Sequence, residues 1–132
     1  MPALADDSGL CVAALGGAPG VQSARYAGEP KSDTRNNEKL LATLANHDSR
    51  AAHFVSVIVF VRHADDPQPL IAEGEWHGEI ITEHRGAGGF GYDPLFFVPE
   101  FGKTAAELDP AVKNGVSHRA QALQSLLARL RR

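Results

Sequence analysis

The sequence has one cysteine, Cys11, among its 132 residues. A single thiol excludes an intramolecular disulfide framework and favours a protein that works in a reducing compartment. Apolar runs of the roughly 20 residues that a membrane-spanning helix needs are absent. The first residues also lack the basic stretch that precedes the apolar run of a signal peptide. We therefore expect a cytoplasmic protein that has no membrane partner.

An excess of basic residues is also missing. Lysine and arginine number 13 against 16 aspartates and glutamates, which gives a net charge of −3. This balance argues against a surface that coats a nucleic-acid polymer. A hydrophobic content of 43% is typical of a globular protein, and 132 residues suit one domain. We expect residues 1–132 to form that single domain.

The most unusual segment is the glycine-rich stretch 86–97. Its glycines allow positive φ angles and a close approach of the backbone to a ligand. Phe90 and Tyr92 flank Gly91, and Asp93 follows directly. Aromatic rings beside backbone N–H groups and a carboxylate suit a flat heterocycle with hydrogen-bonding edges. The alternative is a glycine-rich hairpin whose rings cap the core.

Two adjacent carboxylates, Asp6 and Asp7, follow the short apolar run 2–5 and precede Ser8 and Gly9. We predict a strand whose carboxyl end carries this pair, where open α/β sheets place their sites. Hard oxygen ligands of this kind select Mg²⁺ or Mn²⁺. A turn or helix cap formed by the aspartates is the alternative.

Basic side chains gather near the start of the last predicted helix, for which Ser117 is a suitable N-cap. They are Lys113, His118 and Arg119. Donors and positive potential at a helix N-terminus attract an anion or a keto oxygen. A solvated basic helix start is the alternative. The leucines within 123–130 form one stripe, which we predict to be core.

The rest of the pattern predicts further elements of an α/β protein. A helix capped by Ser32 or Asp33 should end near 46–48. The apolar run 54–61 predicts a central strand with both faces covered. The run 71–80 alternates between an apolar face and a glutamate-rich face, which we expect to be solvated. These two runs should pair as an antiparallel hairpin.

Taken together, the motifs resemble the inosine/xanthosine triphosphate pyrophosphatase family, whose members remove deaminated purine nucleotides. The resemblance runs through the chain and rests on Ala5–Leu10, Gly16–Gly20, Ser23–Tyr26, Gly88–Pro94, Lys103–Leu108 and Ser117–Arg119. It implies an α/β fold with a long twisted mixed sheet, flanking helices and a nucleotide cleft. It also implies a homodimer and Mg²⁺-dependent hydrolysis of dITP, ITP or XTP to the monophosphate and pyrophosphate.

The resemblance assigns the reacting end of the site to Asp6, Asp7 and Ser8. Asp7 would be the general base or metal ligand that readies the attacking water. Asp6 would assist at the metal, and Ser8 would touch the phosphates. A metal lowers the pKa of bound water and withdraws charge from the phosphates, while a carboxylate takes the proton.

The resemblance assigns nucleotide recognition to a second set of residues: Phe90, Gly91, Tyr92, Asp93, Lys113, His118 and Arg119. Phe90 would stack on the purine, and the next three residues would shape the base and sugar pocket. Lys113 would face the nucleotide, and His118 with Arg119 would read the 6-keto edge. Adenine carries an amino donor at that position and would lose a hydrogen bond in a buried site.

One departure from the family concerns the start of the chain. Family members begin with a strand and a loop that grips the triphosphate, followed by a helix and a metal-binding glutamate. Here Met1 lies directly before the strand that leads to Asp6, so we expect an N-terminally shortened member. The alternative function is a non-catalytic module that binds purine nucleotides but has lost its phosphate grip.

Overall fold

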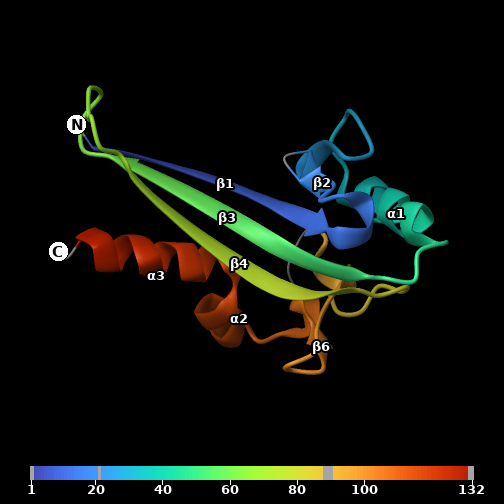
Figure 1. The fold of residues 1–132 in the computed structure, drawn as a ribbon. Helices are drawn as coiled ribbons and strands as arrows, with labels where there is room; N and C mark the ends of the chain where they lie inside the picture. The colour runs from blue at the N-terminus through green and yellow to red at the C-terminus, as the bar shows by residue number, and fades with distance from the viewer. Residues whose placement is uncertain (1, 21, 88–90, 131–132) are drawn as a thin grey trace.

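The structure is a computed structural model that describes residues 2–20, 22–87 and 91–130. Its strands and helices are β1 (Ala3–Val12), β2 (Pro19–Gly20), α1 (Asp33–Leu44), β3 (Ala51–Val61), β4 (Leu70–Ile80), β5 (Phe96–Val98), β6 (Lys103–Thr104), α2 (Pro110–Val116) and α3 (His118–Leu130). Three long strands, β1, β3 and β4, run side by side as a ribbon, with α1 at one end and α3 alongside (Figure 1). No helix among the described residues is long and apolar enough to cross a membrane.

The sheet has the strand order β2-β1-β3-β4-β5-β6, and every described pairing is antiparallel. β3 lies between β1 and β4, which confirms the predicted central strand and hairpin. The fold contains helices and a sheet as expected, but the predicted mixed sheet is not what the described residues form. Each of these strands runs back along its neighbour, so no described pair is parallel.

The strand that carries Asp6 and Asp7 continues to Val12. The two carboxylates therefore lie in the middle of β1, and the prediction that they sit at the end of a strand is wrong. Pairing with β3 continues through Gly9 to the end of the strand. A Cβ atom on Gly9 would lie 2.4 Å from the carbonyl oxygen of Gly20. This glycine accommodates a close backbone approach and does not end the strand.

The two faces of the long strands differ in burial. On one face the predicted alternation of β4 is confirmed, with Ala72, Trp76 and Ile80 buried. A Cβ atom on Gly74 would lie 2.2 Å from the carbonyl oxygen of His118, so α3 rests directly on this face. The other face carries the exposed glutamates of β4 and half-buried valines of β3. The expectation that both faces of β3 are covered is met on one face only.

Helix α3 contacts the sheet through a narrow line of side chains, Ala122 and Leu126, which are buried. The other leucines of the predicted stripe are 42–45% exposed: Leu123, Leu127 and Leu130. The prediction that 123–130 is core is therefore correct at Leu126 and wrong at these three positions. Because the helix lies so close to Gly74, only residues that point straight at the sheet are covered.

The helix boundaries follow the predicted caps. The Ser32 side chain accepts a hydrogen bond from the Arg35 amide at the start of α1. Ser117 Oγ accepts one from the Ala120 amide at the start of α3, at 3.2 Å. These bonds satisfy amides that the first turn of a helix leaves without a partner. The caps fix where α1 and α3 begin, and both helices supply side chains to the site.

Candidate functional site

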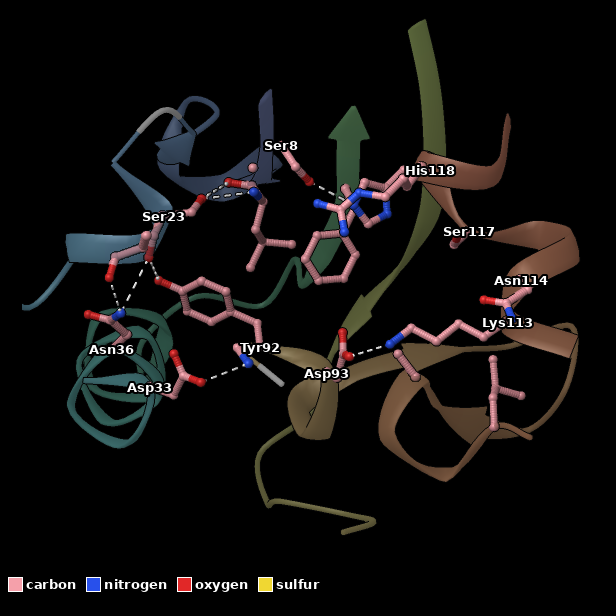
Figure 2. A pocket seen from close by; sticks show the side chains of 18 of the residues that line it. Ser8, Ser23, Asp33, Asn36, Tyr92, Asp93, Lys113, Asn114, Ser117 and His118 are labelled. Atoms are coloured by element: carbon pink, nitrogen blue, oxygen red, sulfur yellow. Dashed lines mark hydrogen bonds and ion pairs between the residues drawn. The ribbon is translucent and has the colours of Figure 1, made fainter. Parts of the chain in front are cut away.

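A cavity of about 840 Å³ lies between β1, α1, the segment 91–93, α2 and the first turn of α3. This volume falls within the range of small-molecule sites. The predicted site residues that line it are Ser8, Gly91, Tyr92, Asp93, Lys113, His118 and Arg119. Figure 2 shows Ser8 and His118 on one side of the cavity, facing Tyr92, Asp93 and Lys113 on the other. Phe90 lies outside the described residues.

His118 occupies the centre of one wall. Its Nε2 lies 2.8 Å from Ser8 Oγ, and the two atoms share a hydrogen bond. Its ring stacks on Phe54, with 4.9 Å between centroids and 18° between planes. Burial, followed by the positive charges of Arg119 and Lys113, lowers the pKa of His118 from 6.5 to about 4. The imidazole is therefore neutral at neutral pH and offers one donor and one acceptor.

His118 should make the stability of the fold depend on pH. Between about pH 4 and 6.5 the unfolded chain binds the proton that the folded imidazole, with its lowered pKa, refuses. The free energy of unfolding should fall as pH falls through this window, by up to about 1.4 kcal/mol per pH unit. Above about pH 6.5 the imidazole is neutral in both the folded and the unfolded chain, so this loss of stability is absent. Urea unfolding at several pH values measures the slope.

The matched comparison uses two histidine variants. His118→Gln should reduce the slope between about pH 4 and 6.5, because the titrating group is gone. His47→Gln changes an exposed histidine that lies outside the cavity, and it should keep the wild-type slope. Equal slopes in the wild type and in His118→Gln would contradict this prediction.

The opposite wall is built by Tyr92. Its side chain is buried, and its hydroxyl donates a hydrogen bond of 2.6 Å to the carbonyl oxygen of Ser23. Burial raises the pKa of the Tyr92 phenol well above its ordinary value, so the hydroxyl stays protonated as a donor. Ser23 Oγ in turn accepts from the Leu10 amide at 2.8 Å. Two hydrogen bonds to Ser23 thus link the Tyr92 ring to Leu10 of β1.

Asp93 and Lys113 form an ion pair in the wall of the cavity. Lys113 Nζ lies 2.6 Å from Asp93 Oδ2 (Figure 2). The Asp93 side chain is 8% exposed and that of Lys113 21% exposed. Lys113 belongs to α2 and not to the first turn of α3. It lines the same cavity as His118, which begins α3. The positive charge predicted to face a nucleotide also balances a buried carboxylate.

Asp6 and Asp7 point to opposite faces of the sheet, because successive strand residues alternate. Asp6 shares a face with Ser8. Its Oδ2 lies 3.1 Å from Arg119 Nε, and Ser56 Oγ donates to its Oδ1 at 3.3 Å. Asp7 is exposed on the other face and does not line the cavity. The structure thus brings Asp6 to the basic side chains and leaves Asp7 apart from them.

The described residues do not form a complete metal site, since none of their His, Cys, Asp and Glu side chains form a group of three placed to hold an ion. Mg²⁺ is commonly held by one or two carboxylates, with water and substrate phosphates as its other ligands. Asp7 fits this role as a single exposed carboxylate. Asp6 fits it less well, because Arg119 already neutralises its charge.

Two residues of α1, Asp33 and Asn36, line the cavity and were not among the predicted site residues. Asn36 is 2% exposed; it accepts from the Ala27 amide at 2.8 Å and donates to the Ala24 carbonyl at 2.9 Å. Asparagine is a poor helix former, so the adjacent pair Asn36 and Asn37 within a predicted helix was a usable signal. Two such residues indicate side chains that bind the backbone of another segment.

Comparison with known proteins finds matches along the chain. A model described as the Ham1 family matches residues 1–129. A dITP/XTP pyrophosphatase of Aromatoleum aromaticum is 69% identical over 130 residues, which are 98% of this chain and 66% of that protein. One from Ralstonia nicotianae is 66% identical over 134 residues, which are 99% of this chain and 67% of that protein.

A solved structure agrees with these sequence matches. A HAM1 protein from Coxiella burnetii superimposes with a TM-score of 0.95 at 53% sequence identity. The match covers 99% of this chain and 68% of that one. The chain therefore spans about two thirds of the length of the relatives it matches.

Proposed function

The chain belongs to the Ham1 family, and we propose from this membership that it hydrolyses deaminated purine nucleoside triphosphates. The substrates are dITP, ITP and XTP, and the products are the monophosphate and pyrophosphate. The observation that carries the proposal is the single cavity at which Ser8, the segment 91–93, Lys113, His118 and Arg119 meet. These residues come from separate parts of the chain, and their types suit a purine with keto groups and an anionic tail.

Recognition of the base rests on His118 and Arg119. Arg119 offers donors only, at every relevant pH. We assign to the neutral His118 ring the tautomer that donates toward the base. A 6-keto oxygen accepts hydrogen bonds from such donors, whereas the 6-amino group of adenine is itself a donor. A buried polar group left without a partner costs about 1–3 kcal/mol, which is a loss of roughly 5- to 150-fold. Adenine nucleotides should be rejected by that factor.

In this scheme the hydrolytic step rests on Asp7, which does not line the cavity. The triphosphate therefore passes the edge of β1, which among the described residues pairs with β2 only at Leu10 and Cys11, to reach the face that carries Asp7. Water attacks phosphorus, the anhydride bond between the α and β phosphates breaks, and Asp7 takes the proton from the water. Mg²⁺, held by Asp7 and the substrate phosphates, would withdraw charge from the phosphates when bound. Positioning and charge neutralisation carry most of the rate in such reactions. In this scheme Lys113 and Arg119, each paired with a carboxylate, supply N–H donors on the cavity side.

A second candidate function is a binding module for purine nucleotides without turnover. One observation favours it: no three ligand side chains are grouped for a metal among the described residues. Such a module binds the base in the cavity and does not hydrolyse the phosphates. It predicts binding of inosine monophosphate and no release of pyrophosphate.

Pyrophosphate release with Mg²⁺ from dITP, dGTP and dATP tests the proposal. We expect kcat/KM for dITP to exceed that for dATP by about 5- to 150-fold, with scarcely any release from dGTP. Calorimetric titration with inosine monophosphate is run in parallel. Binding without release would favour the second candidate. Absence of both would contradict the two functions together.

A further inference from the structure

We propose that Asp33 and Asn37 of α1 are positioning residues that hold the Gly91 peptide and thereby set the wall of the cavity. The wall in question is the segment 91–93, which lines the cavity opposite His118. The inference deepens the proposed function and rests on it for the identity of the ligand, a purine nucleotide. The contacts that hold the wall are independent of that identity.

Both backbone groups of Gly91 are bound by side chains of one helix. The Gly91 amide donates to Asp33 Oδ2 at 3.0 Å (Figure 2), and its carbonyl oxygen accepts from Asn37 Nδ2 at 3.1 Å. Asp33 and Asn37 are four residues apart, so they project from the same side of α1. Gly91 has a φ of 60° and lies outside any strand or helix. Its backbone therefore takes partners from side chains where no ladder supplies them.

The burial of Asn37 explains why an amide stands at this position. The residue is 4% exposed, and its Oδ1 has no hydrogen-bond partner within the described part of the chain. Burying an acceptor without a hydrogen-bond partner lowers the stability of the fold, and an apolar side chain of similar size would avoid this loss. Asparagine is also a weak helix former. The donor to Gly91 is the contact that accounts for Asn37.

The held peptide is followed directly by residues that are fixed as well. Tyr92 is tied to Ser23 through its hydroxyl, and Asp93 is paired with Lys113. With Gly91 bound at both its amide and its carbonyl, three successive residues present one fixed surface to the cavity. Sites of this kind need their walls held within about 0.5 Å. Loosening Gly91 should weaken nucleotide binding and raise KM, with little effect on kcat, since Asp7 lies on the other face.

The test compares two substitutions of Asp33. Asp33→Ala removes both the acceptor and the negative charge, whereas Asp33→Asn removes only the charge and keeps an oxygen acceptor. Asp33→Ala and Asn37→Ala should raise the Kd for inosine monophosphate by about three- to tenfold. Asp33→Asn should change it by less than about twofold. Glu38→Ala, at an exposed acid on the same helix, is the matched control and should bind as the wild type does.

These variants separate positioning from helix stabilisation. An acidic residue in the first turn also favours the helix dipole, and that role would be lost equally in Asp33→Ala and Asp33→Asn. Equal weakening by the two substitutions would therefore overturn the proposal, as would wild-type affinity in Asp33→Ala. Urea unfolding of each variant shows that the fold is retained.

A second measurement needs no nucleotide. Hydrogen exchange of the Gly91 amide, followed by NMR, should be faster by about three- to tenfold in Asp33→Ala and close to wild type in Asp33→Asn. Unchanged exchange in Asp33→Ala would overturn the proposal. A wild-type chain that binds no inosine monophosphate would contradict the proposed function, while the exchange rates would still decide the role of Asp33.

Discussion

Asp7→Asn is expected to lower kcat for dITP hydrolysis by about 10²- to 10⁴-fold, the range that a general base contributes. The affinity for inosine monophosphate should stay at the wild-type value, because Asp7 lies on the face of β1 opposite the cavity. The substitution keeps size and shape and removes the proton acceptor. Steady-state pyrophosphate release gives kcat, and calorimetric titration gives the affinity.

Glu73→Gln is the matched control for Asp7→Asn. Glu73 pairs with Val57, which also pairs with Asp7, so the two acids lie in one cross-strand row on the same exposed face. If the general negative charge of this face drove turnover, both substitutions would lower kcat. We expect only Asp7→Asn to do so. A kcat within about threefold of wild type in Asp7→Asn would contradict the role of general base.

The elements that the sequence predicted well carry strong local signals. The alternation over 71–80 and the apolar run 54–61 define two strands whose hairpin pairing the structure confirms. Ser32 and Ser117 mark the starts of α1 and α3 because a hydroxyl there has a specific backbone amide to bind. Several residues of the motifs, among them Ser8, Tyr92 and His118, line one cavity although the motifs are far apart in the chain.

The elements that escaped prediction depend on contacts between distant segments. Asp6 and Asp7 are neighbours, and only the register of β1 against β3 decides which one faces Arg119. A shift of one residue would exchange them. The exposure of the leucines of α3 likewise follows from the closeness of the helix to Gly74, which no periodicity reports. Asn37 was overlooked because its partner is the backbone carbonyl oxygen of Gly91. No side chain in the sequence indicates that contact.

Lys113→Met is expected to lower the free energy of unfolding by about 2–4 kcal/mol, somewhat less than the loss typical of a fully buried pair. The substitution removes the ammonium group that lies 2.6 Å from a carboxylate oxygen of Asp93, whose side chain is 8% exposed. The methionine keeps most of the length of the lysine side chain, so packing changes little. Urea unfolding at neutral pH measures the difference.

The control is the pair formed by Arg25 and Glu29. Its closest atoms are also 2.6 Å apart, but both side chains are 68% exposed. Arg25→Met should therefore cost less than about 1 kcal/mol, because water screens an exposed pair and solvates the remaining charge. The two pairs share a distance and differ in burial. Equal losses from Lys113→Met and Arg25→Met would contradict the argument that burial sets the cost.

Combining Lys113→Met with Asp93→Asn separates the structural role of the lysine from its role toward a ligand. The double variant has neither buried charge, so it should recover at least half of the stability lost in Lys113→Met. It still lacks the positive charge in the cavity wall, so its Kd for inosine monophosphate should remain raised by about tenfold or more, the worth of a hydrogen bond to a charged group. Recovery of both stability and affinity would show that Lys113 serves only to balance Asp93. Recovery of stability alone places the Lys113–Asp93 pair among the groups that bind the nucleotide.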